Sequence, residues 1–560
     1  MNTYEDIEIE ELPLGVPFFR KKIEDFLKAN GLHLEEVDSY IAIRKREGDI
    51  LGGGGIRGNI IKCVAISEDA RSKGLAAPLV SRLISLGSQR GFQKLRVFTK
   101  PENREIFESL GFRLIAEAPK AVLMENGLPF CHHVSNAPAD SGIIVINANP
   151  FTKGHRYLIE KASRQTGHLF VLVVEEDVSH FPFKERLAMV REGCADLKGV
   201  SVMGGGDSVI SQSAFPSYFL KDLSDAAPTQ MALDLDLFVR QVAPSFNASV
   251  RFVGSEPSDQ LTAAYNELMK KTLPPRGIKV IEIPRLELEG KAVSASAARS
   301  CGSFARLRGL VPDSSLPYIL ADWAEASLME ELHTPLKPGL VGPDGSGSHE
   351  DMDLPLMEKS IKAIRPYFAM MAAMQKDIVT LGKEAEKAML TASGGINTHK
   401  GAVFSMGLAL YALGAMIKRG ENPEIASLQK EISLIAGRIP EDNSTNGYHA
   451  RKAYGAAGAL EMARRGYPSL PQWLAAAGED DNIKVLLLIL SELDDTNILH
   501  RGGPQALKFV KKTSKDLLEN FDKESLKSFG EELKARNLSP GGAADMLALS
   551  LFLNKIFKRI

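Results

Sequence analysis

The chain has 560 residues, of which 44% are hydrophobic and 25% are charged. This is too long for a single hydrophobic core and predicts three or four domains of roughly 100–200 residues each. The 68 Lys and Arg residues nearly balance the 70 Asp and Glu residues, which leaves a formal net charge of −2. Because no dense block of Lys and Arg stands out, the sequence argues against a nucleic-acid partner.

Signals for targeting and for disulfide bonds are also sparse. Residues 1–6 are acidic and lack the basic start and apolar core of a signal peptide. The apolar runs 143–146 and 485–490 fall far short of the ~20 residues that a membrane span requires. The four cysteines lie far apart, with no Cys-x-x-Cys pair: Cys63, Cys131, Cys194 and Cys301. That spacing supports neither a disulfide framework nor a thiolate zinc site, so we expect a cytoplasmic protein without a membrane partner.

Three stretches of the chain differ in their hydrophobic pattern. Residues 1–135 mix strand-like and amphipathic runs, and residues 140–318 alternate buried apolar runs with helical patterns, as βαβ units do. From residue 322 to 560 the strand-like runs disappear, and Ala, Leu and Met recur at helical spacing. The expected fold class is therefore multidomain: an α/β domain (1–135), an α/β domain with a parallel sheet (140–318) and an all-α domain (322–560).

A short turn in the first stretch has the composition of an anion-binding loop. A strand-like run leads to Arg71, Gly74 and Ala76 at the start of a helical pattern. Such a turn presents backbone N–H groups and the positive end of the helix dipole to an anion. With the later stretch 103–112, it resembles the two signatures of the GNAT acetyltransferases. The resemblance implies a GNAT-like domain over 1–135, in which Arg71, Gly74 and Ala76 bind a coenzyme A-like arm.

Two observations limit what this stretch predicts. A tight βα turn without a ligand is an alternative for residues 71–76, and no general base stands out that would make the domain catalytic. The run Gly52–Gly55 lacks the Lys-Ser/Thr that follows a phosphate-binding loop. It lies between two strand patterns, so we expect a hairpin turn with positive φ there.

The middle stretch carries a helix start rich in hydrogen-bond donors. Thr152 is placed to cap a helix whose first turn contains Lys153, Gly154 and His155. Gly154 lets a nucleotide approach the backbone, and His155 can donate to a phosphate oxygen near the helix N-terminus. About 140 residues later, Ser294–Arg299 offers two hydroxyls and a guanidinium at another helix start, which suit the phosphates of a departing pyrophosphate. Taken singly, either motif could be an ordinary capped helix start.

Together, the two helix starts resemble the Thr/His-x-Gly-His and Ile-Ser-x-Ser-x-x-Arg motifs of adenylyl- and cytidylyltransferases. The stretches 147–162, 181–186, 215–221 and 251–257 narrow the resemblance to the citrate lyase ligase family over about residues 1–320. It implies that ATP and acetate form acetyl-adenylate and pyrophosphate, usually with Mg²⁺. The acetyl group then passes to the prosthetic-group thiol on the acyl carrier subunit of citrate lyase. The implied catalytic residues and ATP ligands are Lys153 and His155, and Asn149, Thr152, Gly154, Ser294, Ser296 and Arg299.

Two further arginines stay open at this point. Arg186 and Arg251 are candidates for phosphate or acetate contacts, and a structural ion pair is an equal alternative for each of them.

Four polar clusters interrupt the helical patterns of the last stretch, at residues 334–353, 394–401, 494–503 and 539–545. A helical bundle could bring their charged side chains and Gly-flanked amides to one mouth. Several Asp oxygens would suit Mg²⁺ that carries a triphosphate. As an alternative, Asp353 and Asp545 are N-caps only. The predicted metal or base residues are Asp351, Asp353, Asp494, Asp495 and Asp545, and the predicted phosphate ligands are Lys337, Lys400 and Arg501.

The residue sequences of these clusters resemble those of the triphosphoribosyl-dephospho-CoA synthase family across nearly all of residues 325–560. The resemblance implies that ATP loses adenine while its ribose C1 joins the 2′-hydroxyl of 3′-dephospho-CoA. Such a displacement has oxocarbenium character. One departure concerns Leu460–Met462, where the family usually carries Arg-Gly-Glu, and the following Gly-Tyr467-Pro, where it carries Gly-Phe-Pro. The departure puts this activity in some doubt, unless those residues are structural.

The two resemblances converge on one hypothesis, a cytoplasmic bifunctional enzyme of citrate lyase maturation. One alternative is an adenylyltransferase with an arm synthase that serves another system, such as malonate decarboxylase. The other is a scaffold that docks the acyl carrier without catalysis.

Overall fold

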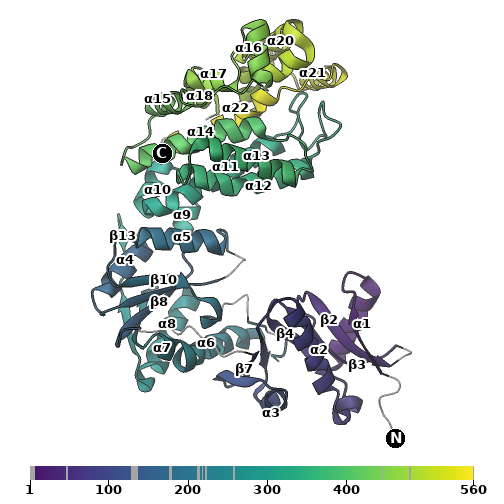
Figure 1. Ribbon diagram of the computed structural model, residues 1–560, viewed down its shortest axis with the longest axis vertical. Helices are drawn as coiled ribbons and strands as arrows, with labels where there is room; N and C mark the ends of the chain where they lie inside the picture. Colours follow the sequence, from purple (N-terminus) through teal and green to yellow (C-terminus); the bar gives the residue numbers. More distant parts are fainter. Residues whose placement is uncertain are drawn as a thin grey trace. The chain divides into compact units, whose positions relative to one another are not determined.

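The computed structural model describes residues 7–45, 48–127, 137–175, 179–210, 215–216, 218–220, 223–256, 259–443, 445–477 and 481–558. Packing divides the chain into two compact units, Met1–Val293 and Ser294–Ile560. The first unit is α/β with two large sheets and a two-stranded sheet of β13 (Glu287–Leu288) and β14 (Lys291–Ala292), and the second unit is helical (Figure 1). The expected multidomain fold class is confirmed, while the three domain ranges stay predictions. Cys131 lies outside the described residues, and the other three cysteines are buried and free.

A mixed seven-stranded sheet in the order β1-β2-β3-β4-β5-β7-β6 forms the N-terminal part of the first unit. Its strands are β1 (Ile7–Leu12), β2 (Ser39–Lys45), β3 (Ile50–Arg57), β4 (Ile60–Ile66), β5 (Lys94–Thr99), β6 (Arg113–Ala118) and β7 (Ala121–Gly127). The helices are α1 (Pro17–Ala29), α2 (Ala76–Gln89) and α3 (Arg104–Ser109). Helix α2 buries Leu79, Val80 and Leu83 against the sheet, because these residues recur at helical spacing on one face. The expected mixture of strands and helices is present here, and the likeness of this part to the GNAT acetyltransferases stays a prediction.

The glycine run Gly52–Gly55, expected to form a hairpin turn, instead lies inside β3. This strand pairs with β2 on one side and β4 on the other, and none of the four glycines has a positive φ. A Cβ built on Gly53 would lie 2.5 Å from the Tyr40 hydroxyl oxygen, and one on Gly55 would lie 2.6 Å from Val37 Cγ1. The glycines are needed because neighbouring side chains pack directly on the strand backbone.

A five-stranded parallel sheet in the order β10-β9-β8-β11-β12 forms the rest of the first unit. Its strands are β8 (Ser141–Ile146), β9 (Leu169–Val173), β10 (Val200–Gly204), β11 (Ala248–Gly254) and β12 (Lys279–Ile283). The helices are α4 (Lys153–Ser163), α5 (Phe183–Gly193), α6 (Ala226–Leu237), α7 (Ala243–Ser245) and α8 (Gln260–Thr272). The chain order reverses between β8 and β11, and ligands of such sheets bind outside the carboxyl ends of the strands at this switch point.

The segment between β10 and β11 packs into the apolar core of the N-terminal sheet. Phe215 packs edge-on against Phe98 of β5 with ring centroids 5.5 Å apart. The Tyr218 hydroxyl donates to the Phe98 carbonyl at 3.4 Å, and Leu233 and Leu237 of α6 belong to the same buried cluster. The segment between β10 and β11 therefore seals the N-terminal sheet onto the parallel-sheet part.

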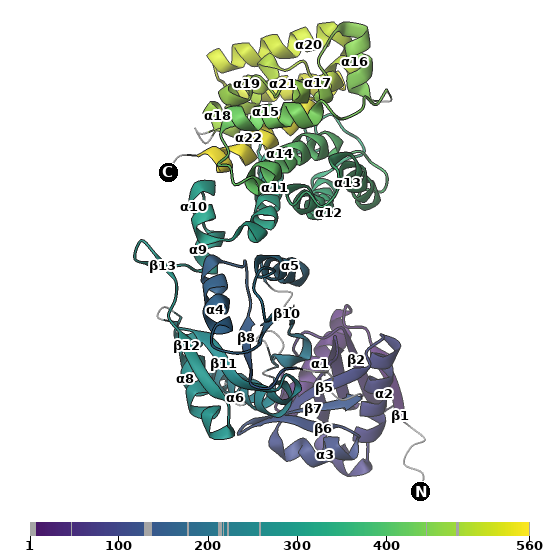
Figure 2. The same cartoon turned by 60° about the vertical axis from the view of Figure 1, so that its left-hand side comes forward.

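The second unit consists of helices that bury apolar faces against one another (Figure 2). They are α9 (Ala295–Arg299), α10 (Phe304–Leu310), α11 (Leu316–His333), α12 (Leu354–Ala372), α13 (Ile378–Ala392), α14 (Lys400–Lys418), α15 (Ile425–Ala436), α16 (Asn446–Tyr454), α17 (Ala459–Arg464), α18 (Leu470–Ala477), α19 (Asn482–Glu492), α20 (Thr496–Glu519), α21 (Lys523–Ala535) and α22 (Gly541–Phe557). Helices α14 and α22 are apolar on nearly all sides because they form the centre of the unit.

Length and apolar composition would allow a single helix of the described chain, α14, to cross a membrane. However, 78% of its apolar window is buried inside the unit, as in the core helix of a helical domain.

A fully buried carboxylate in the N-terminal sheet provides a test of this packing. Glu125 of β7 pairs with Arg96 Nε at 3.0 Å and with Arg113 Nη2 at 2.6 Å. We expect Glu125→Ala to lower the free energy of unfolding by about 3–5 kcal/mol in urea denaturation, because it removes the carboxylate that pairs with the buried Arg96.

The matched control is Glu267→Ala, which removes an exposed ion pair with Lys270 at 2.8 Å. This variant should show no measurable loss of stability, because exposed pairs are screened by solvent. Equal losses in the two variants would contradict the distinction.

Candidate functional site

The start of helix α4 is held by a reciprocal pair of hydrogen bonds. The His155 backbone N–H donates to the Thr152 hydroxyl at 3.3 Å, and the Thr152 N–H donates to His155 Nδ1 at 3.0 Å. This is a capping box in which an imidazole takes the third helical position. The buried Phe151 ring stacks on the imidazole with centroids 5.9 Å apart. The orientation of the ring is therefore set by both neighbours.

These contacts also decide the charge of His155. Because Nδ1 accepts from a backbone N–H, the proton of the neutral imidazole sits on Nε2. Burial, followed by the positive charge of Arg285, lowers the pKa of His155 to about 4. At neutral pH, α4 therefore begins with an uncharged imidazole that offers an Nε2–H donor near the positive end of the helix dipole.

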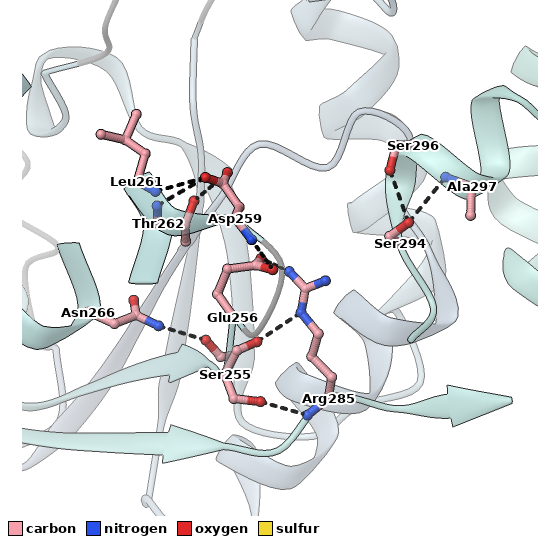
Figure 3. Close-up of polar contacts among 11 residues, drawn as sticks. Ser255, Glu256, Asp259, Leu261, Thr262, Asn266, Arg285, Ser294, Ser296 and Ala297 are labelled. Carbon is pink, nitrogen blue, oxygen red and sulfur yellow. Dashed lines mark hydrogen bonds and ion pairs between the residues drawn. The ribbon is translucent and has the colours of Figure 1, made fainter. Parts of the chain in front are cut away.

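Arg285, which sequence reasoning missed, lies just after β12 at the same edge of the parallel sheet. Its Nε donates to the Ser255 carbonyl at 2.8 Å, its Nη2 pairs with Glu256 Oε2, and its backbone N–H donates to the Ser255 hydroxyl at 3.1 Å (Figure 3). Nη1 has no protein partner among the described residues, and the side chain is 27% exposed. The guanidinium is thus held in one orientation by Nε and Nη2, while Nη1 is available to a ligand. The sequence signal that could have identified Arg285 is its position two residues after the strand-like run that forms β12.

Gly154 has a packing reason that sequence reasoning did not foresee. A Cβ at this position would lie 2.8 Å from the Val293 carbonyl oxygen. Val293 is in turn fixed by its N–H, which donates to the Leu286 carbonyl at 2.9 Å. The loop that leads to Ser294 is therefore seated on the first turn of α4, and this close approach requires glycine.

Arg186 organises the loops at the carboxyl ends of β8 and β9. It is fully buried and donates to the Asn147 carbonyl and to Asn147 Oδ1, both at 2.7 Å, to the Val174 carbonyl at 2.9 Å and to the Phe181 carbonyl at 3.0 Å. Asn149 Oδ1 accepts from the Phe181 N–H at 3.0 Å. Of the alternatives for Arg186, these contacts to carbonyl and amide oxygens support a structural role.

Arg251 is also part of the core. It lies 4.8 Å from the centroid of the Phe238 ring, and only 5% of it is exposed. Burial lowers the pKa of Arg251, while Tyr265 and Asp234 nearby raise it. This packing supports the structural alternative for Arg251.

The Ser294–Arg299 motif forms the start of α9 in the second unit. The Ser294 hydroxyl accepts from the Ala297 N–H at 3.1 Å and lies 3.1 Å from the Ser296 hydroxyl (Figure 3). Arg299 is exposed at the end of this short helix. The roles of these three side chains toward ATP stay predictions.

The predicted coenzyme A turn has the expected local geometry. Arg71 is exposed in a 3₁₀ turn, Gly74 adopts the left-handed conformation with φ of 68°, and Ala76 begins α2. The left-handed residue lets the chain turn sharply into the helix. Binding of a coenzyme A-like arm to this turn stays a prediction.

The five predicted carboxylates of the second unit are not brought to one place. Asp353 caps α12 by accepting from the Leu356 N–H at 2.9 Å. Asp351 is exposed and lies 3.9 Å from His349 Nδ1, and exposed Asp494 pairs with Lys511 at 2.5 Å. These surface contacts satisfy the three side chains locally.

The other two carboxylates join helix N-termini. Asp495 is 3% exposed; it caps α20 through the Asn497 N–H at 2.8 Å and accepts from the Ala543 N–H of α22 at 2.9 Å. Asp545 of α22 accepts from the Ala402 N–H of α14. A Cβ on Gly401 would collide with the Asp545 carboxylate, so this glycine lets the carboxylate reach the helix backbone.

Two predicted phosphate ligands have protein partners. Lys400 Nζ lies 3.2 Å from Glu386 Oε2. Arg501 Nη1 donates to the Ser348 carbonyl at 3.3 Å and to Asn537 Oδ1 at 3.0 Å. Arg501 therefore ties together the loops after α11 and α21.

Sequence reasoning missed two buried groups beside these helix ends, Glu331 and His399. The Lys337 ammonium lies 2.5 Å from Glu331 Oε1, and both side chains are buried. His399 precedes α14, and its Nδ1 lies 3.0 Å from the Ser360 hydroxyl oxygen. His399 lies within the polar cluster 394–401, but a histidine followed by a lysine carries no sequence signal of burial.

In the part of the chain that the structure describes, no group of three or more His, Cys, Asp or Glu side chains has the geometry to hold a metal ion. The predicted set Asp351, Asp353, Asp494, Asp495 and Asp545 therefore does not form a protein-built Mg²⁺ site. The physical reason is that Asp351 and Asp494 have surface partners, while Asp353, Asp495 and Asp545 accept from N–H groups at helix starts.

The departure at Leu460–Met462 lies on α17. Glu461 forms an i,i+4 ion pair with Arg465 at 2.9 Å, and the two side chains are 25% and 58% exposed. The altered residues thus belong to a partly exposed helix.

Comparison with known proteins assigns two families to successive parts of the chain, which meet at residues 317–319 rather than at the boundary of the two compact units. The family described as citrate lyase ligase C-terminal domain matches residues 141–319, and the family described as ATP:dephospho-CoA triphosphoribosyl transferase matches residues 317–560. A citrate (pro-3S)-lyase ligase of Haemophilus influenzae is 37% identical over 333 residues, which are 56% of this chain and 98% of that protein. The corresponding ligase of Escherichia coli is 37% identical over 53% of this chain and 89% of its own length.

The C-terminal part has relatives of its own. A 2-(5′′-triphosphoribosyl)-3′-dephosphocoenzyme-A synthase of Pectobacterium atrosepticum is 35% identical over 301 residues, which are 48% of this chain and 98% of that protein. The chain therefore belongs to two enzyme families at once, the citrate lyase ligases through its N-terminal part and the triphosphoribosyl-dephospho-CoA synthases through its C-terminal part.

Proposed function

We propose that this chain is a bifunctional cytoplasmic enzyme of citrate lyase maturation. Its ligase part adenylates acetate with ATP and passes the acetyl group to the prosthetic-group thiol of the citrate lyase acyl carrier subunit. Its synthase part makes 2′-(5′′-triphosphoribosyl)-3′-dephospho-CoA from ATP and 3′-dephospho-CoA and releases adenine. The observation that carries the ligase activity is the neutral His155 at the start of α4, at the switch point of a parallel sheet.

The first step is an in-line displacement at the α-phosphorus. A carboxylate oxygen of acetate forms a bond to phosphorus, and the bond to the departing pyrophosphate breaks. Negative charge accumulates on the phosphate oxygens, where the Nε2–H of His155 and the first N–H groups of α4 can donate hydrogen bonds. The adjacent Lys153 adds a positive charge, and Arg285 is held by Ser255 and Glu256 at the same edge.

The remaining ligands of ATP come from the two helix starts. Asn149, Thr152 and Gly154 line the approach to α4, and Ser294, Ser296 and Arg299 supply hydroxyls and a guanidinium for the phosphates. In the second step, the turn with Arg71, Gly74 and Ala76 holds the coenzyme A-like arm that carries the thiol.

In the synthase part, Lys400 and Arg501 bind phosphates, and Asp495 and Asp545 are the predicted carboxylates that lie beside other buried charged groups. Mg²⁺ enters as the complex with ATP, so the triphosphate supplies its ligands. The proposed function is tested by incubating the purified chain with ATP plus acetate, and separately with ATP plus dephospho-CoA. Acetate-dependent exchange of ATP with pyrophosphate, and release of adenine, are the expected results. Exchange driven equally well by another carboxylic acid would contradict the acetate assignment.

His155→Ala should lower the acetate-dependent ATP–pyrophosphate exchange rate by a factor of roughly 10²–10³, because it removes a donor to the transition-state charge. The control is His168→Ala. His168 lies at the amino end of β9, on the opposite edge of the sheet, where its Nε2 is 3.0 Å from the Ser201 hydroxyl. This variant should keep the wild-type exchange rate, and near-wild-type exchange in His155→Ala would remove the imidazole from the mechanism.

Arg285→Ala should reduce the same exchange by about 10-fold or more, because a fixed positive charge near the phosphates is lost. An NMR titration provides a second readout. The pKa of His155 should rise in Arg285→Ala but stay below 6.5, since burial is the larger cause of its depression. Arg276→Ala, which removes an arginine paired with Asp236 at 2.7 Å before β12, should change neither quantity. An unchanged exchange rate in Arg285→Ala would make its pair with Glu256 purely structural.

The depressed pKa also predicts a pH dependence. The His155 resonances should titrate near pH 4, so the rate advantage of wild type over His155→Ala should persist from pH 8 down to about pH 5. Between pH 6.5 and 4 the unfolded chain binds a proton at this residue and the folded chain does not. The contribution of His155 to stability is therefore present above pH 6.5 and is lost as the pH falls toward 4. A midpoint near 6.5 would contradict the buried, neutral assignment.

A further inference from the structure

Buried charged groups from several parts of the second unit lie beside one another. We call this set the buried charge cluster: Glu331 of α11, Lys337 of the following loop, His399 before α14, Asp495 before α20 and Asp545 of α22. The pair between Glu331 and Lys337 is direct. Glu331 and Asp495 both raise the pKa of Asp545, and Lys337 lowers the pKa of His399, so the five groups interact electrostatically.

Carboxyl groups outnumber ammonium groups in this cluster. Among the described residues, the cluster contains three carboxyl groups and one ammonium. These groups are shielded from solvent, since only 5% of Glu331 and 3% of Asp495 are exposed. A helical core gains little from buried charges, since apolar side chains of the same volume pack at least as well. An excess of carboxylates suits a site where positive charge develops during a reaction.

His399 is a second and independent observation. The side chain is 5% exposed, and its Nδ1 lies 3.0 Å from the Ser360 hydroxyl oxygen, which lies 2.6 Å from the Thr398 hydroxyl oxygen. The other ring nitrogen, Nε2, is buried without a hydrogen-bond partner in the described chain. Buried polar atoms are nearly always paired, so an unpaired ring nitrogen beside a charge cluster points to a ligand. Burial and Lys337 keep the imidazole neutral by lowering its pKa to about 3.

We propose that the buried charge cluster is the reaction centre of the synthase part, with His399 Nε2 as the acceptor for the attacking hydroxyl of dephospho-CoA. This inference rests on the proposed function of the second unit. The carboxylates of Glu331, Asp495 and Asp545 face the positive charge that develops at ribose C1. Lys337 holds Glu331 in place through their ion pair.

In the proposed step, ribose C1 exchanges its bond to adenine for a bond to dephospho-CoA. The bond between ribose C1 and the adenine nitrogen breaks, and its electron pair leaves with adenine, which takes a proton from solvent. A bond forms between C1 and the 2′-oxygen, whose proton passes to His399 Nε2 and then to solvent. In a displacement of oxocarbenium character the hydroxyl loses its proton only after the new bond has formed. The oxygen is then strongly acidic, so a weakly basic imidazole suffices as acceptor.

The test is His399→Asn in the full chain. Asparagine keeps a polar atom near Ser360 but has none at the place of Nε2. Adenine release from ATP and dephospho-CoA is measured by chromatography. We expect the rate of release to fall by about 10²–10⁴-fold in this variant. The acetate-dependent exchange of the ligase part in the same chain should stay unchanged, and circular dichroism should show an intact helical unit. Asp545→Asn, which can still accept from the Ala402 N–H, should also lose adenine release.

The matched control is Tyr467→Phe. Its hydroxyl is also buried, also lacks a partner in the described chain, and lies close enough to Asp545 for their charges to interact. Removing it should leave adenine release within about two-fold of wild type and should not lower the thermal midpoint. Normal adenine release in His399→Asn, or parallel loss of adenine release and helical structure in all three variants, would overturn the proposal. Absence of adenine with the unaltered chain would overturn the proposed function, and this inference with it.

Discussion

The hydrogen bond from the Thr152 N–H to His155 Nδ1 is the constraint on which the ligase site depends. It ends the loop after β8, starts α4 and selects the tautomer of the imidazole in one contact. A charged His155 would need a proton on Nδ1 and could not accept this bond, so the geometry of the helix start and the neutrality of the ring support each other. The stacked Phe151 and the nearby charge of Arg285 act in the same direction. The result is a donor that carries no charge of its own, at a helix end that already favours anions.

Several charged side chains that could have been ligands instead hold the backbone at the ends of the secondary structure. Arg186 binds three carbonyl groups from two loops, and Asp495 joins the starts of α20 and α22. Loops at the carboxyl ends of parallel strands carry backbone groups without partners in the sheet, and buried polar groups must be satisfied. A buried arginine or aspartate can satisfy several of them at once. Such residues fix the backbone around the candidate sites.

The fold class could be predicted from the sequence because it depends on local periodicity. Apolar runs that alternate with helical patterns gave the parallel sheet, and the Thr152 cap followed from residue type and spacing. The Gly52–Gly55 run was misjudged because the need for glycine comes from Tyr40 and Val37, which pack on it from an adjacent strand and segment. Arg285, Glu331 and His399 were missed for the same reason. Their importance comes from burial and from partners at other points of the chain, which periodicity does not report.

The two parts of this chain solve opposite electrostatic problems with the same elements. Under the proposed function, attack at a phosphorus gathers negative charge in the ligase part, where the structure has a helix N-terminus, a neutral imidazole and the guanidinium of Arg285. Displacement at a ribose carbon gathers positive charge, and in the synthase part the N-termini of α14 and α22 are covered by Asp545 and Asp495. A carboxyl group that accepts from a helix N-terminus occupies the place where another anion would bind. The helix start then carries a buried acidic group. Each helix start has a glycine that leaves room for a close contact. Gly154 lets the Val293 carbonyl approach α4, and Gly401 lets the Asp545 carboxylate approach α14.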